Sequence, residues 1–101
     1  MDRSTEITMV TQTRSGDGIA EVMQETDTDI FAQVRSASRA EFFEGGRSGF
    51  NPAYVFTVFK YEYSGQRIVE YGGERYPIYR TYETRDDNIE LYAERKGGVN
   101  G

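Results

Sequence analysis

Runs of β-branched and aromatic residues, divided by glycine or aspartate turns, recur along most of the chain and restrict its fold more than any other feature. The runs are residues 6–13, 19–24, 28–35, 54–61, 67–71, 75–82 and 88–94. Short strands spaced about 8–12 residues apart are typical of an antiparallel sandwich or barrel. We predict an all-β fold, a small antiparallel β-barrel of six to seven strands, in one domain over residues 1–101 with a flexible tail at 96–101.

The alternation also predicts which side of some strands points into the core. The expected inward residues are Ile30, Ala32, Val34, Ile89, Leu91 and Ala93. The run 54–61 is apolar on both faces, so we expect the core to bury one face and a neighbouring subunit the other. Pro77 has no backbone N–H and predicts a sheet edge or a bulge. Gly72 and Gly73 predict a two-residue hairpin turn.

Residues 36–52 depart from the strand pattern and predict an inserted helix and loop. Ser38 and Glu41 have the spacing of a capping box, in which each side chain accepts a hydrogen bond from the other residue's backbone N–H. We therefore expect a short helix over residues 39–44.

Gly45 and Gly46 are expected to end that helix. Residues 45–49 then form a glycine-rich loop with almost no apolar anchor. Phe42 and Phe43 are adjacent, and adjacent side chains on a helix point about 100° apart. We expect one ring to plug the end of the barrel, while the other is covered by a flanking loop or by a neighbouring subunit.

The chain contains neither cysteine nor histidine. This composition excludes disulfides, zinc sites built on sulfur or imidazole, and histidine-dependent catalytic triads. The acid pairs that could bind a hard cation or transfer protons are Asp27 with Asp29, Asp86 with Asp87, and Glu41 with Glu44. The first two pairs fall where turns are expected, and turns favour aspartate for local hydrogen bonds. We expect a protein that is not an enzyme and that binds no metal or cofactor.

The formal net charge of −5 arises in the N-terminal third of the chain. Residues 1–30 contain seven acids and two arginines, whereas acids and bases balance from residue 31 onward. A dedicated nucleic-acid binder would show a basic footprint instead. The ten arginines and eight tyrosines indicate extensive protein–protein contact or, for arginine, genomic bias alone. No apolar run approaches the ~20 residues of a membrane-spanning helix, so we expect no membrane association.

An ordered series of short motifs follows the acidic third of the chain. The motifs are Ser38-Arg-Ala-Glu-Phe-Phe-Glu44, Val55-Phe56, Tyr63-Ser-Gly65, Val69, Tyr71-Gly-Gly73, Tyr76, Ile78-Tyr-Arg-Thr-Tyr82 and Ile89-Glu-Leu-Tyr92. This set, within residues 28–98, resembles the head–tail joining proteins of tailed bacteriophages, which are also called head-closure or stopper proteins.

The resemblance implies a small β-barrel that oligomerises into a ring below the portal and adaptor proteins. Such a ring extends the DNA channel, helps to retain the packaged double-stranded DNA, and provides the platform for tail proteins. The implied location is the virion, after synthesis in the cytoplasm of the host bacterium.

In stopper-type members a loop projects toward the channel, and the insert at residues 36–52 is the candidate for it here. The expected gating residues are Glu41, Glu44, Gly45, Gly46, Arg47, Ser48 and Gly49. The expected subunit or adaptor interface comprises Arg39, Phe42, Phe43, Phe50, Tyr79, Arg80 and Tyr82.

Two other functions stay open. The first is a monomeric small-barrel module that binds nucleic acid or peptide. A basic groove would favour it, but the aromatic residues are interleaved with acids and bases in equal measure. The second is an acid-pair hydrolase, which the missing histidine and the scattered carboxylates disfavour.

Overall fold

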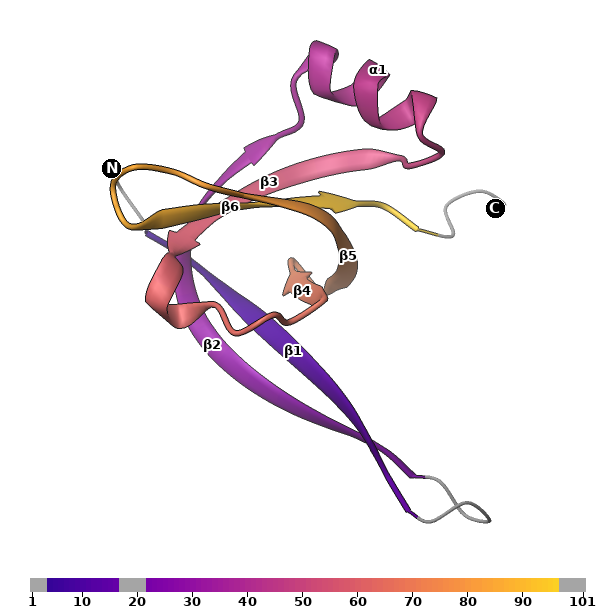
Figure 1. Cartoon of the computed structure of the whole chain (residues 1–101), viewed down its shortest axis with the longest axis vertical. Helices are drawn as coiled ribbons and strands as arrows, with labels where there is room; N and C mark the ends of the chain where they lie inside the picture. Colours follow the sequence, from indigo (N-terminus) through magenta and orange to yellow (C-terminus); the bar gives the residue numbers. More distant parts are fainter. Residues whose placement is uncertain (1–3, 17–21, 97–101) are drawn as a thin grey trace.

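The computed structural model describes residues 4–16 and 22–96. Its elements are β1 (Thr5–Ser15), β2 (Val22–Ser36), α1 (Arg39–Arg47), β3 (Pro52–Phe59), the 3₁₀ turn η1 (Lys60–Glu62), β4 (Ile68–Tyr71), β5 (Glu74–Glu83) and β6 (Asn88–Glu94). The strands form a closed antiparallel barrel in the order β1-β2-β3-β6-β5-β4 (Figure 1). The predicted fold class, a small β-barrel with one short helix, is confirmed.

The barrel interior is an apolar core around the fully buried Phe56. Its ring centre lies 5.9 Å from that of Tyr54, 5.6 Å from that of Tyr71 and 6.4 Å from that of Tyr76. Other buried members of the core are Ile7, Met9, Ile30, Ala32, Val58, Val69, Ile89, Leu91 and Ala93. Because Val34 also packs against this cluster, the predicted inward faces are confirmed.

β2 is a single strand of 15 residues, whereas the sequence predicts two strands, at residues 19–24 and 28–35. The polar stretch between those two runs suggests a break. However, Glu25, Thr26 and Asp27 continue the ladder with β1 without interruption. These side chains are exposed, so their polarity does not conflict with an extended backbone.

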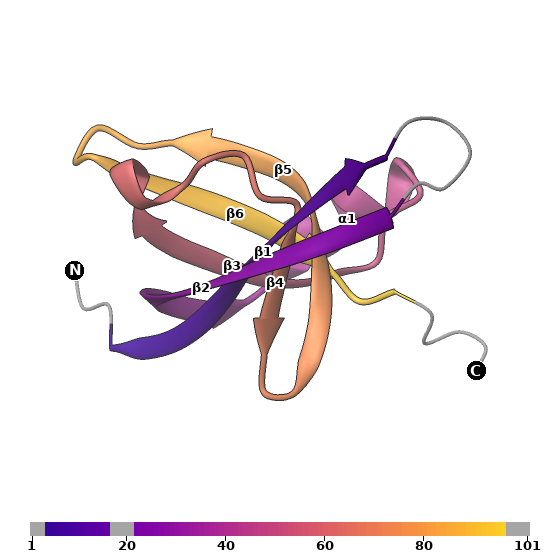
Figure 2. The same cartoon turned by 90° about the horizontal axis from the view of Figure 1, so that it is seen from below.

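β1 and β2 extend past the barrel as a two-stranded ribbon, called the arm here, made of residues 11–15 and 22–26. β4 pairs with β1 only up to Val10, and β3 pairs with β2 only from Gln33 onward. Along the arm the two strands therefore pair only with each other, side by side in Figure 2. The arm and α1 lie toward opposite ends of the longest axis (Figure 1).

β3 is buried on both faces, since residues 55–58 are all buried. The chain itself covers the outward face, where Val55 lies between Arg35 and Tyr92 in the ladders. This corrects the expectation that a neighbouring subunit buries that face. The strand also ends at Phe59, earlier than predicted, because the chain turns into η1 there.

Gly72 and Gly73 form the β4–β5 turn with φ angles of 60° and 84°. Positive φ at both central residues is what a type I′ hairpin turn requires, so the predicted turn is confirmed. Most of the predicted tail at 96–101 and part of the predicted turn at 15–18 lie outside the described residues. No helix in the described part of the chain is long and apolar enough to cross a membrane.

Candidate binding cleft beneath helix α1

The predicted capping box begins α1. Ser38 Oγ accepts a 3.1 Å hydrogen bond from the Glu41 N–H, and the Glu41 carboxylate accepts a 2.8 Å bond from the Ser38 N–H. Arg35, at the end of β2, donates two 2.9 Å bonds to the same carboxylate. The bonds from Arg35 are the main cause that lowers the pKa of Glu41 from 4.5 to about 2. Glu41 thus connects the start of the helix to the barrel.

α1 continues through Gly45 and Gly46 to Arg47 and is longer than the sequence predicts. The helix ends at Arg47 with Ser48 as its C-cap, and Gly49 follows with a left-handed φ of 89°. The N–H groups of Gly49 and Phe50 donate 3.0 Å hydrogen bonds to the carbonyls of Gly46 and Gly45. This pair of bonds is the Schellman motif. The prediction was wrong about which glycine ends the helix, because only Gly49 has the required backbone conformation.

Gly45 is a point of very close approach between α1 and the barrel. A Cβ atom at this position would lie 2.5 Å from Pro52 Cγ and 3.3 Å from the Tyr79 hydroxyl. At Gly46 a Cβ atom would meet nothing within 4 Å. The missing side chain at Gly45 therefore lets the helix pack on the barrel. This contact corrects the expectation of an unanchored loop.

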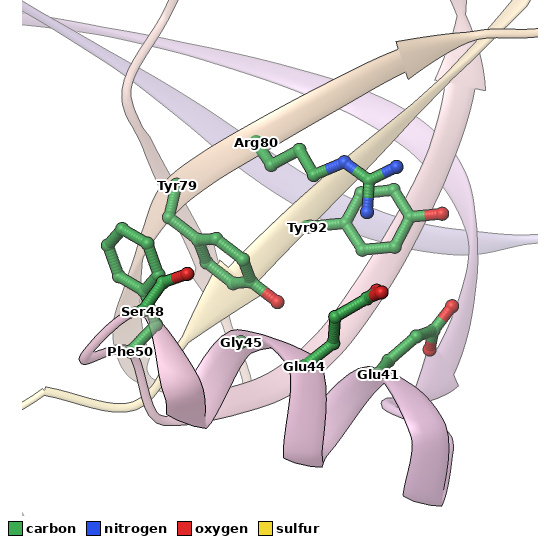
Figure 3. Close-up of a pocket in the computed structure, with 8 residues that line it drawn as sticks. All are labelled: Glu41, Glu44, Gly45, Ser48, Phe50, Tyr79, Arg80 and Tyr92. Atoms are coloured by element: carbon green, nitrogen blue, oxygen red, sulfur yellow. The ribbon is translucent and has the colours of Figure 1, made fainter.

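A cleft of about 400 Å³ lies between α1 and the strands β5 and β6 (Figure 3). Its lining residues are Glu41, Glu44, Gly45, Ser48, Phe50, Tyr79, Arg80 and Tyr92. Figure 3 shows Glu41 and Glu44 pointing from the helix toward the strands. A helix and two strands thus contribute opposing walls to one concave site.

A β-bulge in β5 directs two consecutive side chains into this cleft. The ladder with β6 shifts register between Ile78 and Arg80, which makes Tyr79 the extra residue. A bulge sets two residues of one strand against one of its partner and changes side-chain direction locally. As a result, Tyr79 and Arg80 both line the cleft. Pro77 predicts a sheet edge or a bulge at its own position, but β5 is not an edge strand, Pro77 pairs with Ile68 of β4, and the bulge lies between Ile78 and Arg80.

The cleft has aromatic walls and an excess of nearby carboxylates. Phe50 stacks on Tyr79 with ring centres 4.5 Å apart, and the Arg80 guanidinium lies 4.7 Å from the ring centre of Tyr92. The Tyr92 hydroxyl donates a 2.8 Å bond to Glu90. Burial, followed by this bond, raises the pKa of Tyr92 to about 12. Burial, with carboxylates adding to it, also raises the pKa of Tyr79. Such a site favours a guest that combines an apolar body with a hydrogen-bond donor or a cation.

Residues from both predicted sets meet in the cleft. The set expected to gate the channel contributes Glu41, Glu44, Gly45 and Ser48, and the set expected to form the interface contributes Phe50, Tyr79 and Arg80. The other predicted residues do not line the cleft and are exposed, namely Gly46, Arg47, Gly49, Arg39, Phe42, Phe43 and Tyr82.

Sequence reasoning missed Arg35 and Tyr92 as parts of this site. Strand alternation places both on outward faces, since each neighbours inward residues of its own strand. The register then aligns Arg35, Val55, Tyr92 and Arg80 across four adjacent strands. Alternation alone predicts on which face of its strand each of the two residues lies. Their alignment with Val55 and Arg80 depends on strand pairing and on the bulge.

Away from the cleft, α1 presents apolar surface to solvent. Phe42 and Phe43 are 45% and 61% exposed, and their rings meet edge to face with centres 5.9 Å apart. No residue of α1 is buried. Neither ring plugs the barrel, which corrects the expectation for one of them.

Among the described residues, no group of three or more acidic side chains is placed to hold a metal ion. No family model matches the chain, and comparisons with curated proteins and with solved structures give no significant match. The fold, the cleft and the surface of α1 are therefore the basis for a functional proposal.

Proposed function

We propose that this protein is a head-closure connector of a tailed bacteriophage. In this role, copies of the barrel form a ring below the portal–adaptor complex, extend and gate the DNA channel, and offer a platform to the tail. The protein is then a structural component of the virion, and DNA passes through the ring without sequence-specific contacts.

The observation that carries the proposal is the aromatic surface of α1. Phe42 and Phe43 are exposed on a helix that buries none of its residues, whereas the barrel beneath is closed and well packed. Clustered exposed aromatic residues on a folded domain mark contacts with other proteins. A closed barrel with such a helix at one end suits a subunit that joins its neighbours through α1.

Arg39 and Tyr82, which the sequence also assigns to the interface, are exposed as well. In a ring, each subunit uses one surface against the next subunit and a different surface against the previous one. The phenylalanine surface and the cleft are two such different surfaces. The aromatic cleft walls formed by Phe50 and Tyr79 suit a side chain from the adjacent copy.

The charge of the chain supports a role as a DNA conduit. Duplex DNA carries one negative charge per ~1.7 Å of axis, so strongly basic channel walls would hold it back. The net charge here is −5, and Glu25, Asp27 and Asp29 are exposed on β2. Acids that recur around a ring would create a repulsive, low-friction field.

We assign the gating role to α1 as a unit, because the residues proposed for a flexible loop are largely helical. α1 is held at its start by Arg35 and Glu41 and near its end by the packing of Gly45 on Pro52. A movement of the insert would therefore shift a whole short helix, with its exposed phenylalanines.

The central test is Phe43→Ser, with Tyr61→Ser as a matched control. Both rings are largely exposed, at 61% and 69%, so each change should alter the free energy of unfolding by less than about 0.5 kcal/mol. We expect Phe43→Ser to reduce ring formation on purified portal–adaptor complex, as counted by native mass spectrometry and electron microscopy. Tyr61→Ser should assemble normally.

If Phe43→Ser lowers the melting temperature as strongly as it reduces assembly, Phe43 contributes to the stability of the fold. That outcome would remove the basis for the proposal. A wild-type protein that stays monomeric on the platform and shifts DNA in a gel would instead support the monomeric binding module. Genome loss from filled heads, measured with Phe43→Ser virions, tests the gating role separately.

A further inference from the structure

We propose that the free edge of β2 binds an extended segment of a partner protein by strand addition, and that this segment carries lysine or arginine at alternate positions. The site comprises residues 23–31 of β2. The inference does not depend on the proposed function, because it involves neither α1 nor a ring.

The backbone of β2 has one unpaired side along most of its length. Over residues 22–32, β2 pairs with β1 on one side. On the other side, the described residues provide no ladder partner until Gln33 meets Thr57 of β3. Each strand residue directs its N–H and C=O to one side, alternately. A strand edge of this length is therefore a row of hydrogen-bonding groups that a second extended chain can occupy.

β3 leaves room for such a chain where it separates from β2. Beyond the Gln33–Thr57 pair, the chain turns into η1. A hollow of about 290 Å³ lies there, lined by residues that include Asp29, Phe31 and Phe59. The edge is thus accessible along the arm and also at the wall of the barrel.

The side chains on the outward face of β2 determine what can bind. Glu25, Asp27 and Asp29 lie at alternate positions and share this face, with Met23 and Phe31 at its two ends. All five side chains are exposed, and Met23 and Phe31 are 50% and 55% accessible. Directly opposite side chains in neighbouring strands lie about 5 Å apart, where opposite charges stabilise and like charges destabilise the pair.

The acids argue against a second copy of β2 as the occupant. When two identical edges pair antiparallel, outward-directed residues face outward-directed residues, so odd positions face odd positions. The registers with the longest overlap then place Asp27 opposite Asp27, and Glu25 opposite Asp29. Charges on a strand edge protect a protein from pairing with itself in this way.

The complementary occupant has basic side chains opposite the three acids and apolar side chains opposite Met23 and Phe31. Arg75 already donates two hydrogen bonds to Glu25, so a basic side chain there shares that carboxylate, and the attraction comes mainly from Asp27 and Asp29. Such a segment has nine residues, with the order apolar, basic, basic, basic, apolar at every second position. No stretch in the described part of this chain has three basic residues at alternate positions. The occupant is therefore a segment of a different protein.

Three synthetic nine-residue peptides test the inference with the full-length protein. The first has the sequence Val-Thr-Lys-Thr-Lys-Thr-Lys-Thr-Val. The second has glutamate in place of each lysine, and the third keeps the lysines but has proline in place of each threonine. Proline removes the backbone N–H, so the third peptide keeps the charge but pairs poorly with a strand. Binding is measured by NMR titration at two salt concentrations, together with amide hydrogen exchange.

We expect the lysine peptide to bind about tenfold more tightly than either of the others, and to slow exchange at every second amide of residues 23–31. Asp27→Lys should weaken binding of the lysine peptide about tenfold, because it replaces an attraction with a repulsion. Asp86→Lys, at an exposed position in the β5–β6 turn, makes the same charge change elsewhere and should leave binding unchanged.

Equal binding of the lysine and proline peptides would mean charge attraction without strand pairing and would overturn the proposal. Slowed exchange at another strand, or equal effects of Asp27→Lys and Asp86→Lys, would do the same. Dimerisation of the protein through the arm, detected by sedimentation without any peptide, would identify a second copy as the occupant instead.

Discussion

The barrel and the two elements attached to it, α1 and the arm, are held in place by different kinds of interaction. The barrel encloses fully buried side chains such as Phe56 and Leu91. α1 buries none of its residues, and the side chains of the arm are mostly exposed. Each of these elements is instead joined to the barrel by an ion pair between an arginine and a glutamate. Arg35 pairs with Glu41 of α1, and Arg75 pairs with Glu25 of the arm.

This difference separates stability from binding in one small domain. Burying an apolar side chain contributes roughly 1.5–3 kcal/mol, whereas an exposed ion pair contributes roughly 0–1 kcal/mol. Changes in the barrel should therefore affect folding. Changes in α1 or the arm should affect folding less, and should mainly affect where those elements lie and what they bind.

Phe56→Ala should destabilise the whole protein by about 3–5 kcal/mol, because it leaves a cavity at the centre of the aromatic cluster. Chemical denaturation gives the free energy of unfolding. Phe43→Ala removes the same atoms from an exposed position and should cost less than about 0.5 kcal/mol. If Phe56→Ala yields too little folded protein, Ile89→Val should still cost about 0.5–1.5 kcal/mol. Equal costs at Phe56 and Phe43 would mean that α1 belongs to the core.

Gly45→Ala and Gly46→Ala should have opposite effects. The new methyl group at Gly45 would lie 2.5 Å from Pro52 Cγ, and relieving such a clash typically costs about 1–3 kcal/mol. At Gly46 the methyl group would meet nothing within 4 Å, and alanine should stabilise the helix by about 0.5–1 kcal/mol.

Thermal unfolding measures the two glycine effects, and crystal structures of both variants would show whether α1 has moved. A neutral Gly45→Ala would mean that the approach of the helix to the barrel is loose. Destabilisation by Gly46→Ala would mean that the open space at Gly46 does not decide its effect on the helix.

The sequence predicts the barrel well, because alternation reports local strand faces. Ile30 and Ala32 on β2, and Leu91 and Ala93 on β6, are inward as expected. The start of α1 is predictable for a similar reason, since Ser38 and its partner lie three residues apart. In each case the cause and its effect lie within a few residues of each other along the chain.

The errors occur where distant residues decide the structure. Gly45 remains helical because it packs on Pro52 and because the left-handed residue comes later, at Gly49. The cleft depends on the bulge at Tyr79 and on the strand order that places β6 beside β5. Neither the packing nor the strand order appears in a pattern of nearby residues, so the two predicted residue sets gave no sign that they meet.

Glu41→Gln should cost about 1 kcal/mol, because it weakens both the helix cap and the bond to Arg35. The folded-state pKa of Glu41 is about 2, below its ordinary value of 4.5. The carboxylate therefore stabilises α1 fully above pH 4.5, and this contribution is lost as the pH falls from about 4.5 to about 2.

Amide exchange in α1, followed from pH 6 to pH 3, measures this effect, with Glu44→Gln as the control on the same helix. Glu44 lines the cleft without being part of the cap, so its variant should resemble the wild type. If the acid dependence of α1 persists in Glu41→Gln, another group is responsible for it.

Arg75→Gln should have the smallest effect on stability and the most local one. Arg75 donates 2.9 and 2.7 Å bonds to Glu25 in the arm and a 2.7 Å bond to Glu70 on β4. Its bonds are the main cause that lowers the pKa of Glu25 to about 2. In the variant we expect that pKa to rise toward 4.5 and the amides of the arm to exchange faster, with almost no change in melting temperature.

Arg85→Gln, in the exposed turn between β5 and β6, provides the control for the loss of one positive charge. NMR titration of the glutamate carboxyl groups measures the pKa of Glu25, and hydrogen exchange measures how well the amides of the arm are protected. If Arg75→Gln lowers the melting temperature as much as a core change does, the arm unfolds together with the barrel. The strand edge of β2 would then be a rigid extension of the core, and a partner that adds to it would stabilise the whole domain, not the arm alone.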